Sequence, residues 1–326
     1  MKITPTRSLL ITGFTSWLAL SGAPCLAQNP YPTKPIRLLV GAPPGGSNDV
    51  LARAIGQKMG DSLGQSVVVE NRPGASQMIA ADLTAKSPPD GYTLYVTSTT
   101  YTTGAALSAH LPFDPIADLS GITMLGFGPM VLVIHPSLPV KNTYQWVQLL
   151  LKHKGELNYT SSGMGGINHL AMEVLKSKAH LDIMHVPHKG MGPALTDLIA
   201  GQVQAVIVGL PSVESHLKSG RLRALGVSSA KRSVFAPDIP SIAEAIPGYD
   251  VSLWWGIFCN SKTPRPIVDR LNHEIHKTLS HTEIKKRFSE FGAQPNPMSP
   301  EAFSAFVSEE IKTWSLVIKQ NKIKSE

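Results

Sequence analysis

Two glycine-rich turns, each between a short apolar run and an amphipathic stretch, carry the clearest chemistry in this sequence. The first covers residues 43–48 after the run 36–40, and the second covers residues 161–166 after the run 157–160. A turn of this kind at a helix start exposes backbone N–H groups at the positive end of the helix dipole, which suits an anion such as a carboxylate. Glycine lets a ligand approach the backbone closely. Two such turns predict facing halves of one anion site, although the local pattern leaves open that both are merely tight strand-to-helix turns.

Two polar residues stand at the starts of the helices that follow these turns. Asp49 is expected to cap or support the first helix rather than to act as an acid or base. His169 lies in the first turn of the second helix. Two roles are open to it: a ring nitrogen donates to a carboxylate, or the side chain caps the helix or packs locally. Both residues therefore belong to the candidate site.

The segment after residue 184 holds a second pair of histidines. His185 and His188 have a spacing seen in metal sites, but Pro187 argues against a helix there, and no convincing third and fourth ligands accompany them. We therefore expect no metal site. Lys189 and Gly190 follow directly and are interpreted as a loop that offers donors to a ligand.

Enzyme motifs fail on inspection. The chain has no G-x-S-x-G elbow and no Walker A lysine, and the glycines at 163, 165 and 166 lack the spacing of a dinucleotide fingerprint. Ser161 and Ser162 lie beside glycines, so a hydrolase stays as an alternative, without a motif that supplies its base and acid. We predict a binding protein without catalysis or cofactor.

Short β-rich runs alternate with helical stretches along the body of the chain, which predicts an α/β fold. Strands are expected at 36–40, 67–70, 92–97, 130–134, 157–160, 203–208, 222–227 and 251–259. Helices are expected at 49–59, 79–86, 143–154, 167–175, 212–218, 266–279, 282–291 and 300–319. No Gly/Ser linker occurs, so the apolar segments near 121–134 and 251–259 are expected to join two lobes as crossover strands. Of Trp254 and Trp255 in the second segment, one ring is expected in the core, while the other is placed to face the cleft or to serve structure alone.

The N-terminus reads as a cleaved secretory signal peptide. Lys2 and Arg7 precede an apolar run from residue 9 to residue 20, and Cys25-Leu26-Ala27 supplies small residues for cleavage after Ala27. Removal of these 27 residues leaves 299 of the 326, enough for two domains of ordinary size. The expected location of the mature chain is the periplasm.

Composition narrows the class of protein further. The formal charge of +7 falls to +5 without the two leader cations, and no block of five or more like charges suggests nucleic-acid binding. A mildly basic surface either attracts anionic solutes over a long range or has no functional significance. Of the two cysteines, Cys259 alone survives cleavage, which excludes an intrachain disulfide and predicts a buried, inert thiol.

Ordered sequence blocks along the whole mature chain resemble the substrate-binding receptors of tripartite tricarboxylate transporters, the Bug family of periplasmic receptors. The blocks include PGGSND at 44–49, VENRPGA at 69–75, PDGYTL at 89–94, HVP at 185–187, PALTDL at 193–198, SGRLRAL at 219–225 and PGY at 247–249. The resemblance implies a periplasmic-binding-protein type II (Venus-flytrap) fold with two α/β lobes joined by crossover strands. It places the signal peptide at 1–27, lobe 1 at 28–128 plus 254–326, and lobe 2 at 129–253.

The resemblance also implies that the loops 44–49 and 161–169 line a cleft and hold a ligand carboxylate, partly through ordered water. The predicted ligand-binding residues are Pro44, Gly45, Gly46, Asn48, Asp49, Ser98, Thr99, Ser161, Gly163, Gly165, Gly166, His169, His188, Lys189, Gly190 and Gly209. The implied function is capture of a small carboxylate solute by a monomeric receptor and its delivery to membrane permease subunits of a tripartite tricarboxylate transporter. A ligand-sensing subunit for a membrane kinase remains an alternative, and a periplasmic hydrolase a weaker one.

Three positions depart from the usual pattern of that family. His188 stands where members usually have Tyr, Gly166 where they often have Ser, and Val208–Gly209 where they often have an Asp. All three lie in the predicted second lobe, where the variable end of a ligand would sit. The identity of the ligand is therefore not transferable from a relative.

Overall fold

A computed structural model describes residues 1–2, 31–321 and 323, and the chain from Pro32 onward forms one structural unit. Its strands are β1 (Ile36–Val40), β2 (Val67–Asn71), β3 (Thr93–Ser98), β4 (Leu119–Ile134), β5 (Asn158–Ser161), β6 (Met184–Pro187), β7 (Ala205–Gly209), β8 (Arg223–Val227), β9 (Ser252–Asn260) and β10 (Gln294–Pro295). The signal peptide expected over residues 1–27 lies, beyond residue 2, outside the described residues.

The helices follow most strands directly. They are α1 (Ser47–Leu63), α2 (Met78–Ala85), α3 (Thr100–Leu107), α4 (Thr143–Lys152), α5 (Ile167–Ala179), α6 (Met191–Ile199), α7 (Glu214–Lys218), α8 (Arg265–Ser280), α9 (Thr282–Ser289) and α10 (Pro300–Gln320). Short 3-10 turns occupy Ala75–Gln77 (η1), Leu210–Ser212 (η2) and Ile242–Glu244 (η3). The predicted α/β alternation is confirmed.

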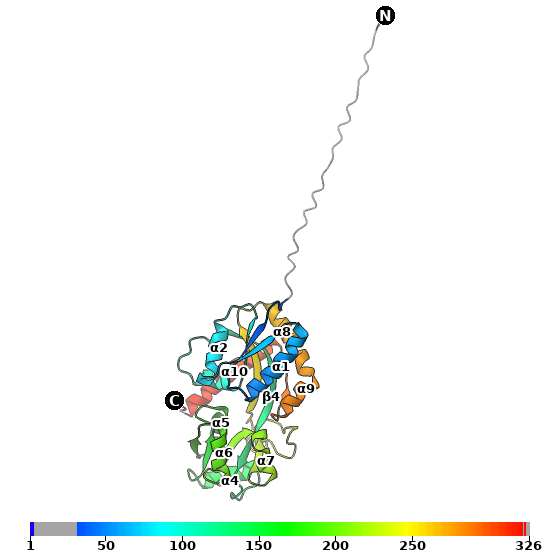
Figure 1. The fold of residues 1–326 in the computed structure, drawn as a ribbon. Coiled ribbons are helices and arrows are strands. Elements are labelled where there is room, and N and C mark those ends of the chain that lie inside the picture. The colour runs from blue at the N-terminus through cyan, green and yellow to red at the C-terminus, as the bar shows by residue number, and fades with distance from the viewer. Residues whose placement is uncertain (3–30, 322, 324–326) are drawn as a thin grey trace. The chain divides into compact units, whose positions relative to one another are not determined.

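Strand β4 belongs to two sheets. Its residues 119–129 pair with β9 in the first sheet, and its residues 130–134 pair with β7 and β8 in the second. The strand order runs β2-β1-β3-β9-β4-β7-β5-β6. In Figure 1, β4 passes from the group of helices that includes α1, α2 and α8 to the group that includes α4, α6 and α7. The segments expected to cross near 121–134 and 251–259 are thus the long paired strands β4 and β9.

Strand directions bring two sets of carboxyl ends face to face. Strands β1, β2 and β3 run parallel to one another, β3 is antiparallel to β9, and β9 is antiparallel to β4, so β1–β3 point the same way as β4. Strand β7 is antiparallel to β4, and β5 and β6 run with β7. Since β4 leads from the first sheet to the second, the carboxyl ends of β1–β3 face those of β5–β7.

The pairing register also gives the separation of the two facing edges. Ser98 at the end of β3 lies opposite Trp255, which lies opposite Gly126, whereas Gly209 at the end of β7 lies opposite Met130. The two edges are therefore four residue steps apart along β4, or about 13 Å at the usual rise of a strand. This spacing suits a small solute.

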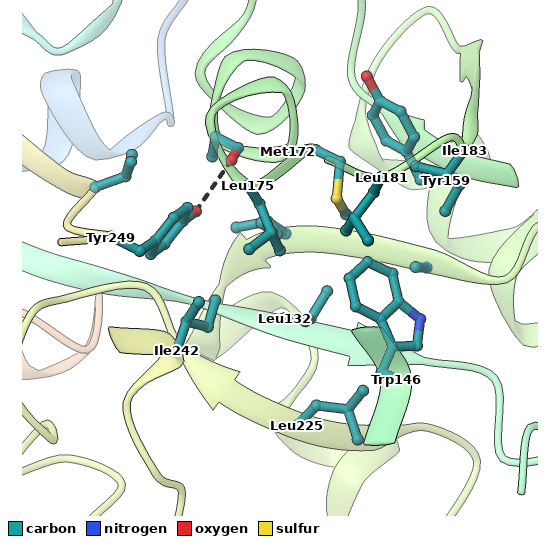
Figure 2. Packing of buried hydrophobic residues seen from close by; sticks show 14 of the residues in the cluster. Leu132, Trp146, Tyr159, Met172, Leu175, Leu181, Ile183, Leu225, Ile242 and Tyr249 are labelled. Carbon is teal, nitrogen blue, oxygen red and sulfur yellow. Dashed lines mark hydrogen bonds between the residues drawn. The ribbon is translucent and has the colours of Figure 1, made fainter. Parts of the chain in front are cut away.

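Each sheet has its own hydrophobic core. The core of the second sheet gathers Leu132, Trp146, Tyr159, Leu175 and other buried side chains, and the Tyr249 hydroxyl donates to the Ala171 carbonyl at 3.1 Å (Figure 2). The core of the first sheet gathers aromatic rings, among them Tyr95, Tyr101, Phe258 and Phe303.

Helix α10 packs against both cores. Phe303, Val307 and Ile311 belong to the core of the first sheet, whereas Trp314, one turn later, belongs to the core of the second. Glu310 accepts hydrogen bonds from Trp254 Nε1 at 2.6 Å and from Thr102 Oγ1 at 2.8 Å, which ties α10 to β9 and α3. Burial raises the pKa of the Glu310 carboxyl to about 7.

Two helices were not predicted from the pattern. Every side chain from Tyr101 to Ala105 in α3 is buried, so its sequence lacks the polar face that reveals a helix. Helix α6 begins after Gly190 with Pro193 in its first turn, and that composition favours a loop when judged by itself.

Two further observations concern the surviving cysteine and the length of the apolar helices. Cys259 is fully buried, as predicted, and burial raises the pKa of its thiol to about 11. Within the described residues, we find no helix with the length and apolarity needed to span a bilayer.

Candidate functional site

The first glycine-rich turn leaves the start of α1 open. The helix is preceded by Gly46 in extended conformation, with φ −74° and ψ 168°, and no described side chain caps it. The first N–H groups of any α-helix lack an intrahelical partner. Gly45 has φ +84°, and a Cβ placed there would meet no described atom within 4 Å. Backbone donors and empty space therefore coincide at this turn.

Asp49 holds the turn from inside. Its Oδ2 accepts from the Gly45 N–H at 2.9 Å, and its Oδ1 accepts from Asn71 at 2.9 Å and pairs with Arg53 at 2.9 Å. Burial opposes ionisation, but the hydrogen bonds from Arg53, Gly45 and Asn71 outweigh it and lower the pKa of Asp49. The carboxylate supports the helix start, as expected, and its oxygens are engaged by the protein.

The end of β3 adds two hydroxyl residues beside this turn. Ser98 is half-buried at the end of the strand. Thr99 is buried and exchanges hydrogen bonds with the backbone of Trp254, at 3.2 Å from its N–H and 3.0 Å to its Oγ1. Both tryptophan rings are buried, and Trp255 Nε1 donates to Ser47 Oγ at 3.1 Å. Trp255 therefore braces the start of α1.

The second glycine-rich turn repeats the arrangement of the first. Helix α5 is preceded by Gly166 in extended conformation, with φ −68° and ψ 160°, again without a described side-chain cap. The Gly165 N–H donates to His169 Nδ1 at 3.0 Å, just as the Gly45 N–H donates to Asp49. In each turn a side chain four residues downstream fixes the backbone and leaves the helix N–H groups uncapped.

His169 belongs to a buried stack behind the second turn. Its ring lies 4.0 Å from that of His185, which stacks on Tyr159 at 4.8 Å. Its Nε2 lies 3.9 Å from the Glu173 carboxylate, which accepts from Tyr159 and Lys176. With Nδ1 used by the Gly165 N–H, His169 holds the second turn, and its direct donation to a carboxylate stays a prediction.

The alternative of a serine hydrolase draws on a contact in the same stack. Ser161 Oγ lies 2.7 Å from His185 Nε2, the spacing of a nucleophile and its base. Ser161 is fully buried, however, and its hydroxyl also donates to the Gly163 carbonyl at 2.9 Å. Burial and the neighbouring His169 lower the pKa of His185 to about 3, which makes it a weak base. The contact therefore helps to hold the second turn in place.

Strand β6 places the remaining predicted residues beside the second turn. His188 Nδ1 lies 2.8 Å from Thr160 Oγ1, and its Nε2 lies 2.7 Å from the carboxylate of Asp197 on α6. The Gly190 N–H donates to the Ser162 carbonyl at 3.1 Å, while Lys189 is exposed. The described residues contain no group of three or more His, Cys, Asp or Glu suited to a metal ion.

One residue of this region escaped prediction. Asn168 accepts from Ser162 Oγ at 3.0 Å and donates to the Ile207 carbonyl at 2.7 Å, so it links the second turn to β7, which ends at Gly209. The sequence signal for Asn168 is its position in the first turn of a helix that follows a glycine-rich turn.

The second turn lies close to the end of α3. A Cβ on Gly165 would lie 2.3 Å from Leu107 Cδ2, at the end of α3 in the first sheet's half. Two cavities lie elsewhere: one of about 970 Å³ is bordered by α10, Trp254 and residues 229–235, and one of about 580 Å³ lies between α1 and β2. The uncapped starts of α1 and α5 border neither of these two cavities.

The buried histidines predict an acid-sensitive fold. Burial, with repulsion from Lys176, lowers the pKa of His169 to about 4 from its ordinary value of 6.5, so the unfolded chain takes up a proton before the folded chain does. The contribution of His169 to the free energy of unfolding is therefore fully present above pH 6.5. It is lost as the pH falls toward 4, by on the order of 2 kcal/mol for this one group. Urea denaturation at pH 7.0 and pH 4.5 measures the loss.

His169→Gln tests the assignment, because glutamine retains an acceptor for the Gly165 N–H but does not titrate. The variant should lose less stability on acidification than the wild-type chain, with part of the loss retained through His185. The exposed His273→Gln serves as the matched control and should follow the wild-type profile. An unchanged profile for His169→Gln would contradict the assignment.

Comparison with known proteins decides the family. The model of the Tripartite tricarboxylate transporter family receptor matches residues 51–323. The chain belongs to this family. The receptor is 35% identical to protein BugT of Bordetella pertussis over 98% of each chain, and 32% identical to a UPF0065 protein of Pseudomonas sp. strain P51 over 97% of this chain and 95% of the other.

Solved structures resemble the receptor over nearly their full length. Rpa4515 of R. palustris, determined with adipate, is 34% identical, with a TM-score of 0.76 over 90% of this chain and 99% of that one. MatC of Rhodopseudomonas palustris, determined with bound malate, is 30% identical, with a TM-score of 0.73 over 88% of this chain and all of that one. The receptor therefore has the periplasmic-binding-protein fold of its family, and the resemblance seen in the sequence is confirmed.

Proposed function

We propose that the receptor captures a small dicarboxylate in the periplasm and delivers it to the membrane permease of a tripartite tricarboxylate transporter. One observation carries the proposal. Helices α1 and α5 both start after an extended glycine with no described side-chain cap, at carboxyl ends of strands that face each other. Two helix N-termini aimed at one space suit a ligand with negative charge at both ends.

The relatives support a dicarboxylate. Rpa4515 was solved with adipate and MatC with malate, and both resemble this receptor over most of its length. The separation of about 13 Å between the two edges, set by four residue steps along β4, matches a short chain with a carboxylate at each end. The first turn would hold one carboxylate through α1, and the second turn would hold the other through α5.

In this proposal the two lobes are those of the sequence prediction, residues 28–128 with 254–326 and residues 129–253, and the cleft between them closes on the ligand. The structure adds one refinement to this proposal, since Trp314 of α10 packs in the core of the second sheet. In this proposal the predicted ligand residues line the facing edges, from within the loops 44–49 and 161–169 and from positions 98, 99, 188, 189, 190 and 209. A non-catalytic receptor needs only to bind and release.

Calorimetry and thermal denaturation with adipate, malate and their diamides test the proposal. We expect one of the acids to bind and to stabilise the receptor by about 2.7 kcal/mol at a hundred times its dissociation constant. The matching diamide keeps the length but removes the charge, so it should produce no shift. Equal binding of acid and diamide, or no binding by any dicarboxylate in a wider series, would overturn the proposal.

A further inference from the structure

A strained turn lies beside the first glycine-rich turn. Ala75, Ser76 and Gln77 have φ values of +47°, +50° and +74°, so three consecutive non-glycine residues occupy the left-handed region. Such backbone is unfavourable for residues with a Cβ and persists where packing over-determines it, often at functional sites. The packing is present here, because a Cβ on Gly41 would lie 2.6 Å from Gln77 Cβ, and one on Gly104 would lie 2.8 Å from Ser76 Cβ.

The strained turn directs the Gln77 side chain to the ends of the strands. The residue is 8% exposed. Its Oε1 accepts from Thr97 Oγ1 at 2.6 Å and from Asn48 Nδ2 at 3.2 Å. Its Nε2 donates to Ser98 Oγ at 3.3 Å. Gln77 therefore connects the first turn of α1 to the end of β3 by one amide.

The polarity of this amide determines the polarity of Ser98. Two donors hold the Oε1 end, so the Nε2 end must face Ser98 and occupy a lone pair of its hydroxyl. The Ser98 proton is then left to point outward, toward Thr100 Oγ1 at 3.4 Å or toward a ligand. A hydroxyl that accepts from inside the protein presents a donor at its exposed side.

We infer that Gln77 is a positioning residue that makes Ser98 a hydrogen-bond donor and thereby selects ligands whose end group is acceptor-only, such as a carboxylate. The inference rests on the proposed function and names one of its determinants. The turn at residues 75–77 places the amide beside Ser98. The two donors on Oε1 then fix the orientation that gives Ser98 this polarity.

A double-mutant cycle on adipate binding tests whether Gln77 acts through Ser98. We expect Gln77→Met, which preserves shape but removes both amide groups, to weaken binding about tenfold. Ser98→Ala should weaken binding to a similar extent, and the double variant should bind as weakly as Ser98→Ala alone. A residue with a merely structural role would give effects that multiply.

Gln57→Met on the exposed side of α1 is the matched control and should bind like wild type. If Gln77→Met does not fold, Gln77→Gly relieves the positive φ and takes its place in the cycle. Wild-type affinity in the Gln77 variant, or multiplying effects in the double variant, would overturn this inference while leaving the proposed function intact. Failure of the wild-type receptor to bind any dicarboxylate would overturn both.

Discussion

Gly165→Val is expected to weaken dicarboxylate binding by more than tenfold. Gly165 has φ +69°, which a β-branched residue adopts poorly, and its added Cβ would lie 2.3 Å from Leu107 Cδ2. The substitution therefore disturbs both the N–H that bonds His169 and the approach of the second turn to α3. Calorimetry with adipate or malate measures the loss, at least 1.4 kcal/mol.

Gly45→Val tests the effect of a side chain in the first turn without a clash against another protein side chain. Gly45 has φ +84°, but a Cβ there meets no described atom within 4 Å, so the valine projects into the space assigned to the ligand. We expect the same tenfold or greater loss with a smaller decrease in stability than in Gly165→Val. Restoration of part of the affinity of Gly165→Val by Leu107→Ala would show that contact with α3 causes part of its loss.

Gly64→Val provides the control for backbone strain alone, because Gly64 has φ +67° and open space but ends α1 at the far end from the turn. It should reduce stability without changing affinity. Full-strength binding by both Gly45→Val and Gly165→Val, with circular dichroism showing intact folds, would exclude the turns as the ligand site.

The turns were predictable because their signal is local. A buried strand, a run of glycines and a helix with regular apolar spacing occur within about thirty residues, and each feature follows from backbone geometry. Helix α5 begins at Ile167, where the apolar pattern places its start, although α1 begins at Ser47 instead of residue 49.

Contacts between distant segments were not predictable. Gln77 lies 29 residues from Asn48 and 21 from Ser98, and no pattern in the sequence marks its amide as the link between them. The sequence leaves open whether His169 contacts a ligand or packs locally, since the choice depends on whether Gly165 takes its Nδ1. The contacts of Gln77 and the role of His169 both depend on side-chain rotamers, which tertiary packing fixes.

Helix α10 illustrates the same limit for packing. Its apolar spacing predicts one buried stripe, and the stripe exists, but the sequence does not say that successive turns contact different cores. Trp314 is 4% exposed within the core of the second sheet, with Val317 and Ile318 packed against the same cluster. The last third of α10 thus joins β4 and β9 as a connection between the two halves.

Trp314→Ala is therefore expected to destabilise the receptor by about 3 kcal/mol, the lower end of the range for truncation of a buried tryptophan. The lower end applies because Trp314 also borders the cavity of about 970 Å³, from which water enters the space the ring leaves. Trp314→Phe retains an aromatic ring in the same buried position and removes the indole nitrogen. Trp314→Phe should reduce the free energy of unfolding by less than about 1.5 kcal/mol.

Urea denaturation followed by circular dichroism compares the variants. A loss below about 1 kcal/mol in Trp314→Ala would show that α10 does not hold the second half in place.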